Sequence, residues 1–368
     1  MMLDVLANND WKRGIFFSSP GGSDVSMALY KRGYLKQDGM AFELTPLNNR
    51  SERLMSDKMY NNLMSKYLYG EMSNPNVLTD YYTRRHTSQY RSQFASLAED
   101  FLRKIDEAKD AKEKGSNYIN LLREAGRIDE ANDMARILKT ADKDIPVYRK
   151  KAANLLKRSL EVMPANVVID YGEPGPTRDQ YNVGSMTFEA YGDGILHDYV
   201  GLLFQAGEKK AANDLGLEIA RELESILAYF EKSDVYFAGR NSKDLFATLD
   251  VYLKMSAAAV NPTFGDPNGK LSKHTQAKIS SLYKVVFPKM YADLKAKAEN
   301  NGESARRGST AGKYASMLFD IQDNIEAIGI HYGIMKAPIN TAPSVDNTEG
   351  MNLEQMMQQM DRGDSVLK

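Results

Sequence analysis

The stretch Leu121-Leu-Arg-Glu-Ala-Gly-Arg-Ile-Asp-Glu-Ala131 decides the fold class of this chain. Apolar residues end one helical segment, an Ala-Gly pair turns the backbone, and acidic residues open the next helix. Leu202-Leu-Phe-Gln-Ala-Gly-Glu-Lys-Lys-Ala-Ala212 repeats this arrangement about eighty residues later. Small residues after such turns let antiparallel helices approach closely, which indicates a tetratricopeptide-like array of helical hairpins. The full repeat period is absent, so ordinary helical hairpins fit the pattern equally well.

On both sides of these turns, apolar residues recur three or four positions apart, which predicts a mainly α fold. Pro146 is expected to start a helix that ends at Met163-Pro164, and Pro288 is expected to kink another helix. The other expected helices lie near residues 54–67, 80–112, 195–205, 208–230, 243–259, 275–300 and 310–332.

Residues 1–50 predict a small α/β element in front of the helices. A short buried strand over 13–18 precedes a Pro-Gly-Gly turn and a short helix, which Ser23 or Asp24 caps and which closes at Gly33. Alternation of apolar and polar residues over 40–45 predicts a second strand.

The expected helical domain covers residues 51–336 and is followed by a tail. The Pro- and Gly-rich interval 164–194 interrupts the domain as a long ordered loop or small hairpin, and loops of this length tend to be functional or mobile. Residues 337–368 form a polar linker and a short terminal amphipathic helix. Its apolar stripe consists of Leu353, Met356, Met357 and Met360. We expect the stripe to dock on the body of the protein, with a detachable partner-binding helix as the alternative.

The composition limits the classes of function. The 368 residues include 48 basic and 49 acidic ones, for a formal net charge of −1. This balance lacks the basic excess of a general nucleic-acid binder, although a local patch is compatible with it. The absence of cysteine excludes disulfides, thiolate nucleophiles and cysteine-ligated metal centres. No stretch approaches the roughly 18–20 apolar residues of a membrane span, and no signal peptide is expected.

No residue pattern predicts a catalytic centre, a metal site or a cofactor. The four histidines are scattered, and His197 is the best ligand candidate because Asp193 and Asp198 lie near it on the same expected helix. A structural hydrogen bond is the favoured interpretation of His197.

The candidate binding residues lie in the interval 164–194. Tyrosines there can line a sugar- or peptide-binding concavity of a helical array, and core packing is the alternative. A pair of carboxylates can cleave a glycan when both face the sugar, and solvated loop carboxylates are the alternative. The tyrosines are Tyr171, Tyr181 and Tyr191, and the carboxylates are Asp170, Glu173 and Asp179.

Several segments carry, in order, a resemblance to one family. They are Leu6-Ala-Asn-Asn-Asp-Trp-Lys-Arg-Gly-Ile-Phe-Phe17, Gly39-Met-Ala-Phe-Glu-Leu-Thr-Pro46, Met59-Tyr-Asn-Asn-Leu-Met64 with Tyr69-Gly70, Arg91-Ser-Gln-Phe-Ala-Ser-Leu-Ala98 and Leu160-Glu-Val-Met-Pro164. The first resembles the W-(K/R)-R-P-I-Y-F segment of a large family of multi-spanning Bacteroidetes membrane proteins. Gly14 stands where proline is common there, and Phe16 stands where tyrosine is common. The match covers most of residues 3 to 235.

This family is similar to the protein O-mannosyltransferases of the GT-C type. The resemblance implies that the catalytic acid lies in a membrane-spanning part that precedes this chain. The chain is then a non-catalytic C-terminal region on the periplasmic face, which contacts an acceptor protein or the membrane-spanning part. Trp11, Phe16 and Phe17 are expected to pack at the junction between this region and the membrane-spanning part. Without that part, they are expected to leave an apolar surface that lacks some of its packing partners. An autonomous helical scaffold or peptide-binding module is the alternative, and a carboxylate-dependent glycan-active enzyme is a third.

Overall fold

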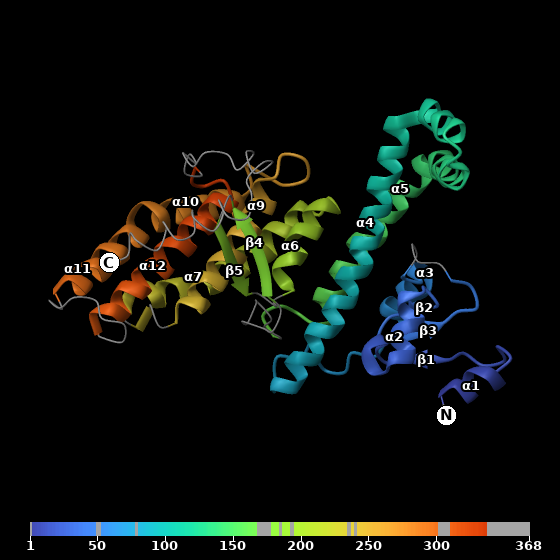
Figure 1. Ribbon diagram of the computed structural model, residues 1–368, viewed down its shortest axis with the longest axis horizontal. Helices are drawn as coiled ribbons and strands as arrows, with labels where there is room; N and C mark the ends of the chain where they lie inside the picture. Colours follow the sequence, from blue (N-terminus) through green and yellow to red (C-terminus); the bar gives the residue numbers. More distant parts are fainter. Residues whose placement is uncertain are drawn as a thin grey trace, which may run out of the picture.

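The computed structural model describes residues 2–48, 53–77, 80–167, 178–183, 186–191, 195–233, 237–238, 241–300 and 310–336. These residues are mainly helical, with a small antiparallel sheet near the N-terminus, as the sequence predicts. Figure 1 shows two long helical segments, α4 (Tyr81–Glu124) and α5 (Ile128–Val162), between the N-terminal element and a block of later helices. Gly115, with a φ of 64° and a ψ of −171°, breaks α4 into two helices.

The N-terminal element consists of short helices and a three-stranded sheet. Its members are α1 (Met2–Asn8), β1 (Phe16–Phe17), η1 (Pro20–Gly22), α2 (Asp24–Lys31), β2 (Leu35–Gln37) and β3 (Phe42–Leu44). The strand order is β1-β3-β2, and both pairs are antiparallel. Ser23 caps α2 through a reciprocal capping box with Ser26, which confirms the predicted helix start. The sequence does not predict β2, because three residues are too few for an alternating pattern.

The two predicted hairpin turns have the same geometry. Gly126 and Gly207 have positive φ, of 76° and 85°. The N–H of the next residue bonds five residues back, from Arg127 to Leu122 at 2.9 Å and from Glu208 to Leu203 at 2.8 Å. This Schellman arrangement ends the helix before each glycine and reverses the chain. The predicted helical hairpins are therefore confirmed at both turns.

The hairpin of α4 and α5 is packed differently along its length. Its base contributes large side chains, such as Phe94, Phe101 and Leu156, to the main core cluster. Its middle is packed through buried alanines, including Ala111 and Ala141, which allow a close approach of the two helices. The tip, with the stretch 121–131, has a separate small cluster and projects away from the rest of the molecule in Figure 1.

The predicted helix start at Pro146 is wrong. Helix α5 runs from Ile128 to Val162 with Pro146 inside it. An internal proline removes one helical hydrogen bond. Flanking residues Ile145 and Tyr148 pack against the main core, and we attribute the continuity of the helix to this tertiary packing. The predicted end is confirmed, because Met163 is the C-cap residue.

The later part of the chain forms a helical block with one β-hairpin. The hairpin consists of β4 (Arg178–Val183) and β5 (Met186–Tyr191). The helices are α6 (Leu196–Gln205), α7 (Lys209–Lys232), α9 (Ser242–Val260), α10 (Lys270–Ser281), η3 (Leu282–Val286), α11 (Phe287–Asn300) and α12 (Thr310–His331). A second core cluster joins the end of α7 with α9, η3, α11 and α12.

The long helix predicted near residues 275–300 is interrupted just before Pro288. The five residues of η3 form a π-helical turn between α10 and α11. A proline ring clashes with the carbonyl four residues earlier in a regular α-helix, and the wider π turn relieves this clash. A second π-helical turn, η2 (Asn62–Lys66), follows α3 (Ser56–Asn61) where the N-terminal element meets α4.

Candidate functional site

A tight turn presents Trp11 to solvent. The N–H of Lys12 donates to the carbonyl of Asn9 at 2.9 Å, and the Asn9 amide donates to the carbonyl of Arg13 at 2.8 Å. Both central residues have positive φ, 45° at Asp10 and 57° at Trp11. Residues other than glycine avoid this region at a cost of about 1–2 kcal/mol each, and such strain is concentrated at functional sites. The Trp11 side chain is 57% exposed, so a strained turn holds an aromatic side chain in water.

Trp11 also forms a wall of a cavity of about 220 Å³ in the N-terminal element. The cavity is lined by Leu6, Asn9, Trp11, Ile15, Leu29, Tyr34 and Leu44. Tryptophan is enriched among the residues that carry most of the binding energy at protein–protein interfaces.

Three other large apolar side chains of this element are exposed. Val5 is 54% exposed, Phe16 52% and Leu47 78%. With Trp11, the described part of this element exposes four large apolar side chains. We call Val5, Trp11, Phe16 and Leu47 the exposed apolar set. Phe17, the third predicted junction residue, is half-buried in β1, and the junction role of all three remains a prediction.

The turn between β2 and β3 fastens the element to the helices. Gly39 has a φ of +90°, and a Cβ atom there would lie 2.2 Å from the hydroxyl oxygen of Tyr67. That hydroxyl donates to the carbonyl of Asp38 at 3.2 Å. The buried carboxylate of Asp38 accepts a hydrogen bond from the Asn62 amide at 2.7 Å. This joint leaves little freedom for the turn to move against η2.

A second polar joint links α3 to α4. The hydroxyl of Ser56 donates to the carboxylate of Asp100 at 2.6 Å, and the ammonium of Lys104 lies 2.7 Å from the same carboxylate. Burial alone would raise the pKa of Asp100, but the bonds from Lys104 and Ser56 outweigh it and hold this pKa below its ordinary value. The carboxylate is therefore ionised at neutral pH and contributes to the joint.

Arg91 ties the first part of α4 to the end of α5. Its side chain is fully buried, and its guanidinium donates to the carbonyls of Met163 at 2.9 Å and Pro164 at 3.4 Å. The hydroxyl of Tyr199 donates to the backbone carbonyl of Arg91 at 2.9 Å and lies 2.7 Å from the Ser159 hydroxyl. A cation is favourable at the carboxyl end of a helix, where carbonyl groups lack intrahelical partners.

These contacts bring together segments that carry the family resemblance. Asn62 in 59–64 bonds to Asp38, the residue before 39–46, and Arg91 in 91–98 bonds to the segment 160–164. Their order in the chain does not reveal these contacts. Arg91 and the segment 160–164 therefore link the two long helices, whereas most side chains of the joints to the N-terminal element lie outside the resembling segments.

The structure describes only part of the predicted binding loop. Asp170, Tyr171 and Glu173 lie outside the described residues. Asp179, Tyr181 and Tyr191 lie in the β4–β5 hairpin, whose register pairs Tyr181 with Phe188 and Tyr191 with Arg178. Sugar or peptide binding by these tyrosines, and glycan cleavage by these carboxylates, remain predictions.

His197 lies inside the helical block. It is 5% exposed, and its Nε2 lies 3.4 Å from the ammonium of Lys254 and 3.4 Å from the carboxylate of Asp198. Burial lowers the pKa of His197 to about 4; Asp198 opposes this shift and Lys254 adds to it. Burial also raises the pKa of nearby Glu99, and Asp198 adds to that shift. Within the described ranges, no three histidine, aspartate or glutamate side chains are placed to hold a metal ion.

The pKa of His197 predicts an acid-sensitive stability. An unfolded histidine has a pKa near 6.5, so between pH 6.5 and 4 the unfolded chain binds a proton that the folded chain excludes. The stabilisation is complete above pH 6.5 and is lost as the pH falls toward 4. We expect a loss of about 2 kcal/mol at pH 5 relative to pH 7. Urea denaturation across this range should show a smaller pH dependence for His197→Gln than for the control His274→Gln. Equal pH dependence of the two variants would contradict the assignment.

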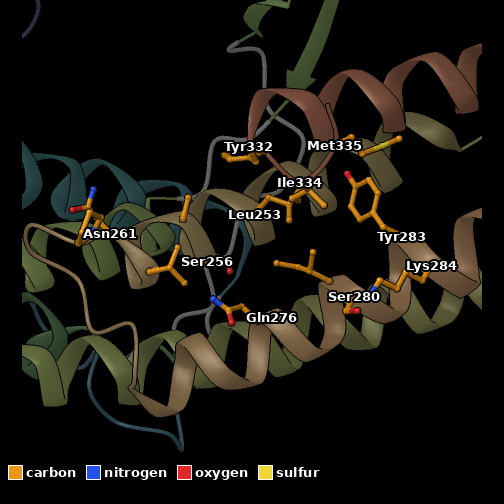
Figure 2. A pocket seen from close by; sticks show the side chains of 14 residues that line it. Leu253, Ser256, Asn261, Gln276, Ser280, Tyr283, Lys284, Tyr332, Ile334 and Met335 are labelled. Atoms are coloured by element: carbon orange, nitrogen blue, oxygen red, sulfur yellow. The ribbon is translucent and has the colours of Figure 1, made fainter. Parts of the chain in front are cut away.

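A groove of about 600 Å³ lies between α9, α10, η3 and the end of α12. Figure 2 shows Leu253 and Ser256 on one side, Gln276 and Ser280 on the other, and Tyr332 to Met335 above. The volume falls in the range of ligand-binding pockets, roughly 300–1,000 Å³. The lining is mainly apolar, with a few polar groups.

The π-helical turn η3 forms one wall of this groove. Its Tyr283 hydroxyl donates to the carbonyl of Ile325 at 3.3 Å, and burial raises the pKa of this tyrosine. A Cβ atom on Gly329 of α12 would lie 2.8 Å from the Tyr283 ring, so glycine is needed for this close packing. π-Helical turns are frequent at functional sites. The sequence predicts neither the turn nor the groove.

None of the helices that the structure describes is long and apolar enough to cross a membrane. No curated protein and no solved structure matches the chain. Residues 1–64, out of 368, match the family model described as TMEM260-associated domain 2. The matched range contains the exposed apolar set and the turn at Gly39. The N-terminal element, with α3 and most of η2, is thus similar to a domain that is named for association with a membrane protein.

Proposed function

We propose that this chain is a non-catalytic helical region of a membrane protein O-glycosyltransferase-like system on the periplasmic face. In this proposal the N-terminal element binds the membrane-spanning part, and the helical hairpins form a tetratricopeptide-like surface for an acceptor protein. One observation carries the proposal: the residues that match a membrane-protein-associated domain are also those that expose the apolar set.

The geometry of the element supports a binding role. Trp11 is held by a strained turn next to a cavity, so the fold of this chain itself builds both the proposed binding residue and its pocket. Preorganised sites lose less conformational entropy on binding. The joints at Gly39 and Asp100 fix the element on α4, and a partner that binds the element is thereby positioned relative to the helices.

Affinity purification from detergent-solubilised membranes of the source cells tests this function. The tagged full chain is expected to recover a multi-spanning membrane protein, identified by mass spectrometry. Trp11→Asp should reduce this recovery at least tenfold, because loss of an interface hot spot costs about 2 kcal/mol or more. Tyr229→Asp is the control, since Tyr229 is equally exposed, at 57%, but lies on α7. Equal recovery with both variants, or no multi-spanning protein with the unmodified chain, would contradict the proposal.

An autonomous peptide-binding module is the second candidate. The groove beside η3 favours it, because its volume and apolar lining suit a short amphipathic segment. In that case the Trp11→Asp variant retains its partners, whereas substitutions in the groove remove them.

A further inference from the structure

The groove beside η3 has an apolar lining with one positive charge. Leu253 is buried at its floor, and Ile334 and Met335 are 37% and 38% exposed at its edge. Lys284 is the only charged residue among those described that line it, and it is exposed. An occupant that matches this lining has an apolar face and a nearby acidic group.

The chain itself contains such a segment. Leu353, Met356, Met357 and Met360 have the i, i+3, i+4, i+7 spacing of one helix face. Glu354 and Asp361 flank this stripe, and residues 353–361 contain no lysine or arginine. Methionine side chains adapt their shape to irregular apolar grooves. This segment lies outside the described residues.

We propose that residues 353–360 bind in the groove beside η3, with the methionine stripe on its apolar lining and the acidic residues near Lys284. The groove is then an intramolecular docking site of the helix-in-groove kind. A partner protein that binds this groove has to displace the tail first. This inference is independent of the role proposed for the N-terminal element.

The chain length between the groove and the segment supports this occupant over a separate molecule. Ile334 and Met335 line the groove, so the tail begins at its edge. Residues 337–352 can span up to about 55 Å when extended, which is ample for a return into a groove between neighbouring helices. A tether of this kind gives an effective concentration in the millimolar range. A binding constant of only ~0.1 mM then suffices to keep the groove roughly 90% occupied.

The absence of cysteine allows a direct test in the full chain. Gln276→Cys places a thiol on the groove wall, and Asn352→Cys places one beside the stripe. A short bis-maleimide should join them within one chain at least ten times faster than it joins Tyr229→Cys with Asn352→Cys. The second pair measures random collisions of the tail with another exposed position.

Two further variants test the stripe itself. Met356→Ser, Met357→Ser and Met360→Ser together should reduce the cross-linking rate to that of the control pair. The matched variant Gln355→Ala, Gln358→Ala and Gln359→Ala should leave it unchanged, because these residues lie off the stripe. Equal rates for the groove pair and the control pair would overturn the proposal. Products of dimer size alone would also overturn it and assign the groove to a second copy of the chain.

Discussion

Replacing Arg91 by methionine is expected to lower the free energy of unfolding by about 1–3 kcal/mol. The guanidinium is fully buried and donates to the carbonyls of Met163 and Pro164 at the end of α5. Methionine fills a similar volume but cannot donate, so the buried Met163 carbonyl loses its partner, at about 1–3 kcal/mol. The Pro164 carbonyl keeps the bond from the Val167 N–H at 3.2 Å.

Urea denaturation at neutral pH, followed by circular dichroism, measures this effect. Arg123→Met is the control, because Arg123 is exposed near the tip of the hairpin, beyond the break at Gly115. We expect this control to stay within about 0.5 kcal/mol of the unmodified protein. An Arg91→Met variant as stable as the control would show that the link between α4 and α5 does not depend on this side chain.

Gly39→Ala is expected to destabilise the protein by about 3 kcal/mol or more. The new Cβ would lie 2.2 Å from the Tyr67 hydroxyl and 2.9 Å from its ring, and the ring cannot move away without breaking the hydrogen bond to Asp38. The φ of +90° adds backbone strain for any residue with a side chain. The turn between β2 and β3 would have to leave η2.

Gly70→Ala separates the steric clash with Tyr67 from the backbone strain of a positive φ. Gly70 also has a positive φ, of 59°, but an added Cβ would meet no atom within 4 Å. Only the backbone strain remains there, about 1–2 kcal/mol. Thermal unfolding should therefore rank the unmodified protein, Gly70→Ala and Gly39→Ala in order of decreasing stability. The opposite order of the two variants would contradict the assigned contact with Tyr67.

The local signals in the sequence predict much of the fold. The two Ala-Gly turns, the cap at Ser23 and the end of α5 at Met163 are as expected, because each depends on residues within one helical turn. The start at Pro146 is wrong because packing of the flanking side chains in the core outweighs a local preference.

The candidate sites depend on information that a single sequence does not carry. Asp10 and Trp11 have positive φ, although neither is a glycine, and no residue pattern predicts that. The contacts of Gly39 with Tyr67 and of Arg91 with Met163 join residues distant in the chain. The groove combines α9, η3 and the end of α12, and no periodicity connects these elements.

In the proposed function, the N-terminal element attaches this chain to a membrane-spanning partner through Trp11. The most direct measurement places a photo-crosslinking amino acid at position 11 of the full chain in the source cells. Irradiation should yield a covalent product with one multi-spanning membrane protein, and the same amino acid at position 229 should yield none. Products that are the same from both positions, or that contain only soluble proteins, would contradict the account.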